Sequence, residues 1–219
     1  MKKLAIAAAL ASAVSPAIAQ DQPANVGTTA PSSKELVRGQ VSKPNYVVGD
    51  WCEFKDRYGN LFRQTVTEKT ESGYVMVAKG EVSPEEVRRY NLDHQLVAVD
   101  TRTFSPFWRS PTFPLRVGQH GPLDEFTYMV RSGKTTAKPE LLPITLERVR
   151  VPAGELDTLM VKTIVKYTRG TGRQNEFHIT HWWPIDPAIK WPVKYEFYDH
   201  GNRNSSSNRS YELVLCGNG

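Results

Sequence analysis

Cysteine and long apolar runs are both scarce in this sequence. Its 219 residues include two cysteines, Cys52 and Cys216, which is too few for a four-cysteine metal site or a dense disulfide framework. No stretch after residue 19 approaches the roughly 20 consecutive apolar residues that a transmembrane helix needs. We therefore expect no transmembrane segment.

Common catalytic and nucleotide-binding motifs are also missing. The sequence has no Gly-x-Ser-x-Gly element and no Gly-rich phosphate loop. The neighbouring pairs Asp93–His94 and Asp199–His200 are more typical of turns than of acid–base catalysts. His178 and His181 are three residues apart, so on a strand their side chains point to opposite faces and cannot share a metal ion. We predict a protein that is not an enzyme and has no metal and no cofactor.

A strong excess of either charge is missing as well. The chain has 28 basic and 23 acidic side chains, and loss of Lys2 and Lys3 would lower its formal charge from +5 to +3. Nucleic-acid-binding proteins usually cluster positive charge on one face. Here the arginines are scattered among acidic residues, so we expect no nucleic-acid partner.

The first nineteen residues have the pattern of a cleavable signal peptide. Lys2 and Lys3 precede a short apolar run, residues 4–14, and Ala17-Ile18-Ala19 fits the small-x-small cleavage rule. Cleavage is predicted after Ala19. No cysteine follows that site directly, so we expect no bacterial lipid anchor, and the predicted location is the periplasm or the medium outside the cell.

An oxidising compartment permits a disulfide between the two cysteines. A Cys52–Cys216 bond would close almost the whole folded region, and it is the favoured prediction. Two separately buried thiols, each acting as a small hydrophobic side chain, remain the alternative.

Three segments are predicted along the chain. Residues 1–19 form the signal peptide. Residues 20–45, rich in Pro, Ser, Thr, Asn and Gln, form a flexible leader because they carry too little apolar surface to fold. Residues 46–219 form one β-rich domain, with strands predicted at residues 50–55, 61–69, 74–79, 95–103, 125–131, 145–151, 156–167, 175–183, 191–199 and 209–215.

The predicted fold is mainly β. Short turns between successive strands require antiparallel pairing, and a sheet of this many strands tends to curl or close. We expect an antiparallel meander that forms a curved sheet or a half-open barrel. Ser83-Pro84-Glu85-Glu86 resembles a helix start, so we allow at most one or two short helices.

Alternation along two predicted strands suggests a binding face. The side chains on this face form either a ligand-binding surface or ordinary core, and aromatic packing alone does not separate the two. The candidate ligand-binding residues are Phe177, Ile179, His181, Trp183, Trp191, Val193 and Tyr195. Residues 104–115 are aromatic and proline-rich, which is typical of a lid or an exposed contact patch.

Two passages carry a family resemblance. The segment from Val151 to Val161, VPAGELDTLMV, resembles the VPAGxFDTxxV motif of uncharacterised exported proteins of Gram-negative bacteria, with Leu156 where Phe is usual. Residues 180–184 and 192–196 resemble the TxWYxP and PVKxE segments of that family, and residues 48–51 also fit. This family is distantly similar to the periplasmic lipoprotein carriers of the LolA and LolB type, which implies a curved antiparallel sheet whose concave face holds acyl chains.

Two functions follow as hypotheses. The first is a non-enzymatic periplasmic protein that binds a hydrophobic or lipid-like ligand on the concave face of its sheet. The alternative is a module that binds an envelope protein through a sheet edge or through the 104–115 loop.

Overall fold

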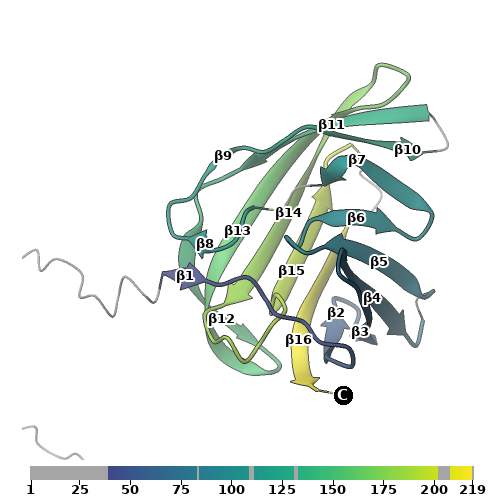
Figure 1. The fold of residues 1–219 in the computed structure, drawn as a ribbon. Helices are drawn as coiled ribbons and strands as arrows, with labels where there is room; N and C mark the ends of the chain where they lie inside the picture. Colours follow the sequence, from purple (N-terminus) through teal and green to yellow (C-terminus); the bar gives the residue numbers. More distant parts are fainter. Residues whose placement is uncertain (1–38, 83, 109–110, 131–132, 202–207, 219) are drawn as a thin grey trace, which may run out of the picture. The chain divides into compact units, whose positions relative to one another are not determined.

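The computed structural model describes residues 39–218 apart from 83, 109–110, 131–132 and 202–207 (Figure 1). The predicted signal peptide, residues 1–19, and residues 20–38 of the predicted leader lie outside the described part. Within the rest of that leader, β1, Gln40–Val41, pairs with β8, Leu115–Arg116. Strand pairing therefore begins before residue 46, where the sequence predicts the domain to start.

Twelve of the described strands form a closed antiparallel barrel (Figure 1). Most neighbours in the barrel are also neighbours in the chain, as expected of a meander, and β16 pairs with β2 to join the last strand to the first large one. In order around the barrel the strands are β2 (Trp51–Asp56), β3 (Leu61–Lys69), β4 (Gly73–Gly80), β5 (Glu86–Asn91), β6 (Leu96–Val99), β7 (Arg102–Trp108), β10 (Phe126–Val130), β11 (Gly133–Leu141), β13 (Gly154–Thr168), β14 (Gln174–Pro184), β15 (Lys194–Asp199) and β16 (Arg209–Gly217).

The long strand β13 shares one edge between two neighbours. Its residues 163–168 pair with β11, which closes the barrel, whereas its residues 154–160 pair with β12, Thr145–Val151. The tip of the β12–β13 hairpin reaches β16, where the Ala153 amide donates to the Leu213 carbonyl at 3.1 Å. The short strand β9, Gly121–Pro122, adds to the other edge of β11.

Period-two alternation decides which side chains enter the barrel. The register of β14 and β15 pairs His181 with Tyr195 and Ile179 with Phe197, so these four side chains share the inner face. The interior of a barrel widens with the number of strands, and about eight strands are already enough for side chains to fill it or to hold one small ligand. A barrel of twelve strands is therefore wide enough to leave internal space.

Two expectations from the sequence are wrong in detail. The predicted helix start at 83–86 leads instead into strand β5, which pairs with β4 and β6; residue 83 itself lies outside the described part. Strand pairing on both edges of β5 outweighs the local capping signature, because tertiary context overrides propensity. No helix occurs among the described residues, so none there is long and apolar enough to span a membrane.

The predicted strand 95–103 is two strands, β6 and β7, joined by a tight turn. Asp100 takes a left-handed backbone conformation with φ of 50°, which Asp tolerates better than most residues. Its side chain accepts a hydrogen bond from the Val87 amide at 2.9 Å, which fixes the turn against β5. Residues 104–108, predicted as part of a loop, belong to β7.

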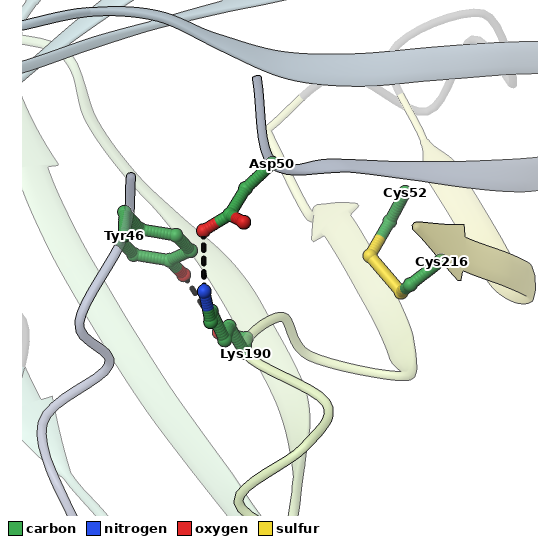
Figure 2. The surroundings of a disulfide bond; sticks show 5 residues. All are labelled: Tyr46, Asp50, Cys52, Lys190 and Cys216. Atoms are coloured by element: carbon green, nitrogen blue, oxygen red, sulfur yellow. Dashed lines mark hydrogen bonds and ion pairs between the residues drawn. A yellow bond between two sulfur atoms is a disulfide. The ribbon is translucent and has the colours of Figure 1, made fainter. Parts of the chain in front are cut away.

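A disulfide joins Cys52 of β2 to Cys216 of β16, as the sequence predicts (Figure 2). The same figure shows a partly buried ion pair nearby, in which Lys190 Nζ donates to Asp50 Oδ2 at 2.6 Å. Tyr46 donates its hydroxyl hydrogen to the Lys190 carbonyl at 2.7 Å. These contacts tie the segments before β2 and before β15 to the same end of the barrel.

Candidate ligand-binding cavity

The barrel encloses a cavity of about 1240 Å³. Its wall is built from side chains of β3–β8, β10 and β13–β16, together with residues from connecting segments. The lining residues include Tyr46, Gln64, Glu86, Arg88, Tyr90, His94, Asp100, Thr101, Phe104, Trp108, Phe113, Met129, Val161, Arg169, Ile179, His181, Trp183, Trp191, Tyr195, Phe197, Arg209 and Tyr211.

The two ends of the cavity differ. At one end, lining residues come from strand ends and turns, including Asp100, Thr101 and Arg169, and we call this end the mouth. At the opposite end of β14 and β15, Tyr46 and Trp191 come from segments outside the strands and pack ring against ring at 4.7 Å. Both rings are buried, so we call this end the base.

Aromatic rings form a continuous wall near the base. Tyr90 stacks on His94 with ring centroids 5.1 Å apart, and His94 meets Trp183 edge to face at 5.4 Å. Phe113 meets the same tryptophan at 5.2 Å. Stacked and edge-to-face arrangements at these separations are favourable beyond simple burial, so the wall is rigid and mostly apolar.

Two histidines in the cavity are held neutral. Burial, reinforced by nearby His181, lowers the pKa of His94 to about 3. Burial, reinforced by the charge of Arg88, lowers the pKa of His181 to about 4. His94 Nδ1 forms a hydrogen bond with the Tyr74 hydroxyl. At neutral pH neither imidazole therefore carries a positive charge that could attract a ligand.

A polar group of side chains interrupts the apolar wall. Arg88 Nε donates to Glu86 Oε1 at 2.5 Å, and Arg209 Nη1 lies 3.5 Å from Glu86 Oε2. Across from them the rings of Tyr195 and Tyr211 stack at 4.6 Å. Burial alone would lower the pKa of Arg88, but nearby acidic groups, Tyr90 and Glu86 first, raise it well above the ordinary value, so Arg88 stays charged.

The two stacked tyrosines keep their protons. Burial raises the pKa of Tyr195 and of Tyr211 above the ordinary value of 10. The donors of Arg88 and Gln64 act in the opposite direction on Tyr211 but do not cancel the effect of burial. Gln64 lies close to the Tyr211 hydroxyl, yet its Nε2 makes no hydrogen bond of normal geometry among the described residues.

Five of the seven side chains predicted as ligand-binding line this cavity: Ile179, His181, Trp183, Trp191 and Tyr195. Phe177 lines a smaller adjoining cavity of about 480 Å³. Val193 is fully buried and packs in a core cluster with Trp182 and Leu213. Val193 and Trp191 precede β15, so strand alternation does not govern their directions.

Sequence reasoning missed the polar side of the cavity. Glu86, Arg88 and Tyr90 alternate along β5 and line the interior. The period-two spacing of these residues is present in the sequence. A face that carries charged side chains is usually exposed to solvent, so the sequence alone does not indicate that this face points inward. Only closure of the barrel, which adjacent pairing alone does not reveal, turns it inward.

Two aromatic side chains of residues 104–115, the segment predicted as a lid or contact patch, pack inward; residues 109–110 lie outside the described part. Phe104 is buried and meets Phe126 at 5.7 Å, and Trp108 stacks on Phe126 at 5.0 Å. These rings pack inside the barrel because β7 takes part in the ladder with β6 and β10. They are therefore not free to form an exposed patch.

The histidine pair considered in the sequence is separated as strand geometry requires. His181 lines the cavity, whereas His178 lies on the outer face with its Nε2 2.7 Å from Glu176 Oε1. His200 Nε2 lies 3.4 Å from His178 Nδ1. Among the described residues, the possible metal-ligand atoms of Glu176, His178 and His200 lie within 4.8 Å of one another. These groups face away from the cavity and take no part in it.

Comparison with known proteins gives similarities of fold. No protein-family model matches the chain, and no curated protein matches it in sequence. The chain is similar to the structure of a Bacteroides fragilis protein described as exported and of YmcC-like fold, with 16% identity and a TM-score of 0.44 over 81% of this chain and 99% of that one. A Parabacteroides distasonis protein described as a lipoprotein gives 15% identity and a TM-score of 0.42 over 80% and 97% of the two chains.

The hypothetical lipoprotein YmcC from Escherichia coli is similar over 77% of this chain and 85% of its own, with 7% identity and a TM-score of 0.48. Similarities this low carry no argument about function. None of these three structures is a LolA or LolB carrier, so the resemblance based on motifs stays a prediction.

Proposed function

We propose that this protein binds a hydrophobic or lipid-like molecule inside its barrel, without catalysing a reaction, in the compartment outside the cytoplasm to which its signal peptide directs it. The observation that carries the proposal is the internal cavity of about 1240 Å³, lined by inward-facing aromatic and aliphatic side chains. Cavities that hold drug-sized ligands measure about 300–1,000 Å³. This one is large enough for a longer chain.

The character of the wall supports an apolar ligand. Val161, Ile179, Trp183, Phe104 and Trp108 present hydrocarbon or ring surface to the cavity. Removal of apolar ligand surface from water contributes about 25 cal/mol for each Å². A ligand with a long hydrocarbon part would gain more from this wall than a sugar or a nucleotide would.

Exposed lining residues at the mouth supply a route for the ligand. Asp100 and Thr101 are exposed and also line the cavity, as does Met129, whose side chain is 65% exposed. A molecule could pass between these strand ends without separation of paired strands. The barrel could therefore load and release its ligand while folded.

Binding of the neutral fluorescent dye N-phenylnaphthylamine tests the proposal. We expect the purified protein to increase the dye's fluorescence in a saturable way. Ile179→Trp, whose larger ring occupies space that the dye would take, should weaken dye binding about tenfold or more, a change of about 1.4 kcal/mol. Tyr198→Trp on the outer face of β15, where Tyr198 is 51% exposed, should bind the dye as the parent does. Equal binding by both variants, with circular dichroism confirming that both are folded, would place the dye outside the cavity and overturn the proposal.

A further inference from the structure

We infer that the cavity selects amphiphiles with an acidic head group, a carboxylate or a phosphate, and that Arg88 binds this group. The inference rests on the proposed function, because it names the class of ligand that the cavity takes. It goes beyond that function in assigning the head-group site to particular side chains on β3, β5, β16 and the segment before β15.

The first support is an excess of fixed positive charge inside the barrel. Two guanidinium groups, those of Arg88 and Arg209, share the single carboxylate of Glu86 at 2.5 and 3.5 Å. All three residues line the cavity. Two positive charges and one negative charge leave a net positive charge, which a ligand anion would neutralise. Arg88 and Glu86 are each about one-quarter exposed, whereas Arg209 is 66% exposed, so Arg88 is the better shielded of the two cations.

Arg88 is placed to make further contacts. A guanidinium carries five N–H donors, and the contact with Glu86 uses the one on Nε. A quarter of the side-chain surface of Arg88 remains accessible, although the residue sits among the strands. That accessible part faces the cavity that Arg88 lines. Arg88 also shares a side-chain hydrogen bond with Tyr211. An arginine with further N–H donors can bind a carboxylate or a phosphate through two parallel hydrogen bonds.

The second support is independent of charge. Gln64 and Trp191 are 5% and 3% exposed, both line the cavity, and the donor atoms Gln64 Nε2 and Trp191 Nε1 have no hydrogen-bond partner among the described residues. A buried donor without a partner costs about 1–3 kcal/mol. Both unpartnered atoms are donors, so the group that would satisfy them is an acceptor of hydrogen bonds. The oxygen atoms of an acidic head group are acceptors of this kind.

Other titratable groups facing Arg88 do not alter the sign of the charge. His181 on β14 is neutral at physiological pH. Burial raises the pKa of Tyr195 on β15 and of Tyr211 on β16 above the ordinary value, so both remain uncharged phenols. The side chain of Tyr90 on β5 also lies near Arg88. Glu86 supplies the single facing carboxylate among these neighbours. The site of Arg88, Arg209 and Glu86 therefore carries a net positive charge at neutral pH.

Displacement of N-phenylnaphthylamine by four amphiphiles of equal chain length tests the inference at neutral pH: dodecanoate, dodecyl phosphate, dodecanol and dodecyltrimethylammonium. We expect at least one of the two acids to bind roughly tenfold or more tightly than dodecanol, because a hydrogen bond to a charged group contributes about 1.5–3 kcal/mol. The cationic amphiphile should bind more weakly than dodecanol. Which of the two acids binds better distinguishes a carboxylate from a phosphate site.

Two variants and a matched control assign the effect to Arg88. Arg88→Met keeps the apolar stem and should abolish the preference for the acids while leaving dodecanol affinity within about twofold. Arg89→Met, on the outer face of the same strand, should behave as the parent protein. If Arg88→Met does not fold, Glu86→Gln serves instead: removal of the competing carboxylate should tighten the binding of the acids severalfold and leave dodecanol unchanged.

The outcomes separate the two proposals. Equal affinity for acid and alcohol in the parent protein would overturn the head-group site while the apolar cavity stands. Failure of the dye and of all four amphiphiles to bind would overturn the proposed function itself. A preference for acids that survives Arg88→Met, or weaker acid binding by Glu86→Gln, would show that Arg88 and Glu86 form only a structural ion pair.

Discussion

Loss of the Cys52–Cys216 disulfide is expected to remove a large part of the stability of this protein. The bond joins residues 164 positions apart, and in the chain-entropy model a loop of that length constrains the unfolded chain by about 5 kcal/mol. In the folded protein the two cysteines already face each other in the β2–β16 ladder. Removal of the bond should therefore change the unfolded state much more than the native contacts.

The magnitude is large compared with ordinary stability. Domains unfold with a free energy of about 5–15 kcal/mol, so the reduced protein should be close to marginal. We expect the variant Cys52→Ala/Cys216→Ala to unfold in urea with a free energy about 5 kcal/mol lower than the oxidised parent. The slope of that free energy against urea should also rise, because an unfolded chain without the cross-link exposes more surface.

Reduction of the unmutated protein supplies the control. Cys52 is fully buried, so its replacement by alanine also removes packed volume, whereas reduction keeps both sulfur atoms. Tryptophan fluorescence should give the same loss of stability for the reduced parent and for the double alanine variant, to within about 1 kcal/mol. A reduced protein about as stable as the oxidised one would refute the chain-entropy reasoning and assign the variant's loss to packing.

Three further predictions concern other parts of the barrel. Lys190→Met should lower the free energy of urea unfolding by about 3 kcal/mol, since it leaves the carboxylate of Asp50, 1% exposed, without its partner; an unchanged midpoint would contradict this. Because the folded pKa values of His94 and His181 lie near 3 and 4, below the ordinary 6.5, the unfolded chain binds protons that the fold does not. The free energy of unfolding should therefore fall as the pH drops from 6.5 towards 4, by about 1.4 kcal/mol per pH unit for each histidine. In His94→Asn this free energy, measured by urea titration at each pH, should depend less steeply on pH across this range. Phe126→Ala, at a side chain with no exposed surface, should cost about 3–5 kcal/mol in the same assay, and a loss below about 1 kcal/mol would show that the site collapses around the smaller residue.

Much of the barrel could be predicted from alternation of apolar and polar residues. The segments that became β3, β13 and β14 each contain long period-two patterns bounded by turn residues, and their predicted bounds differ from the observed ones by a few residues at most. Local patterning is sufficient there because each strand presents one apolar and one polar face.

Strands that depart from this pattern were missed. β11 contains Pro139, which cannot donate to a ladder and argues against a strand. In the structure its carbonyl accepts a hydrogen bond from the Leu123 amide at 3.0 Å. β5 carries a capping signature at its start and a charged inner face. Both strands are specified by their neighbours across the barrel, and a single sequence contains no direct record of those pairings.

The candidate site was predictable to the same extent. Ile179 and His181 were placed correctly by the period of β14. The role of Arg88 depends on closure of the sheet, which places β5 opposite β13 and β14. Closure results from two pairings between strands that do not follow each other in the chain, β11 with β13 and β16 with β2, so the polar half of the cavity could not be deduced from adjacent strands.

The difference between the two ends of the cavity has a consequence for how a ligand would enter and leave. Tyr46 and Trp191 fill the base, and the tip of the β12–β13 hairpin is fastened to Leu213. These side chains close the base of the barrel, so its cavity opens at the mouth and does not run through the molecule. Under the proposed function, a ligand that enters at the mouth, past Asp100 and Arg169, also leaves there. One ligand therefore has to dissociate before the next can bind. Loading and release would then take place at the same rim and would therefore alternate.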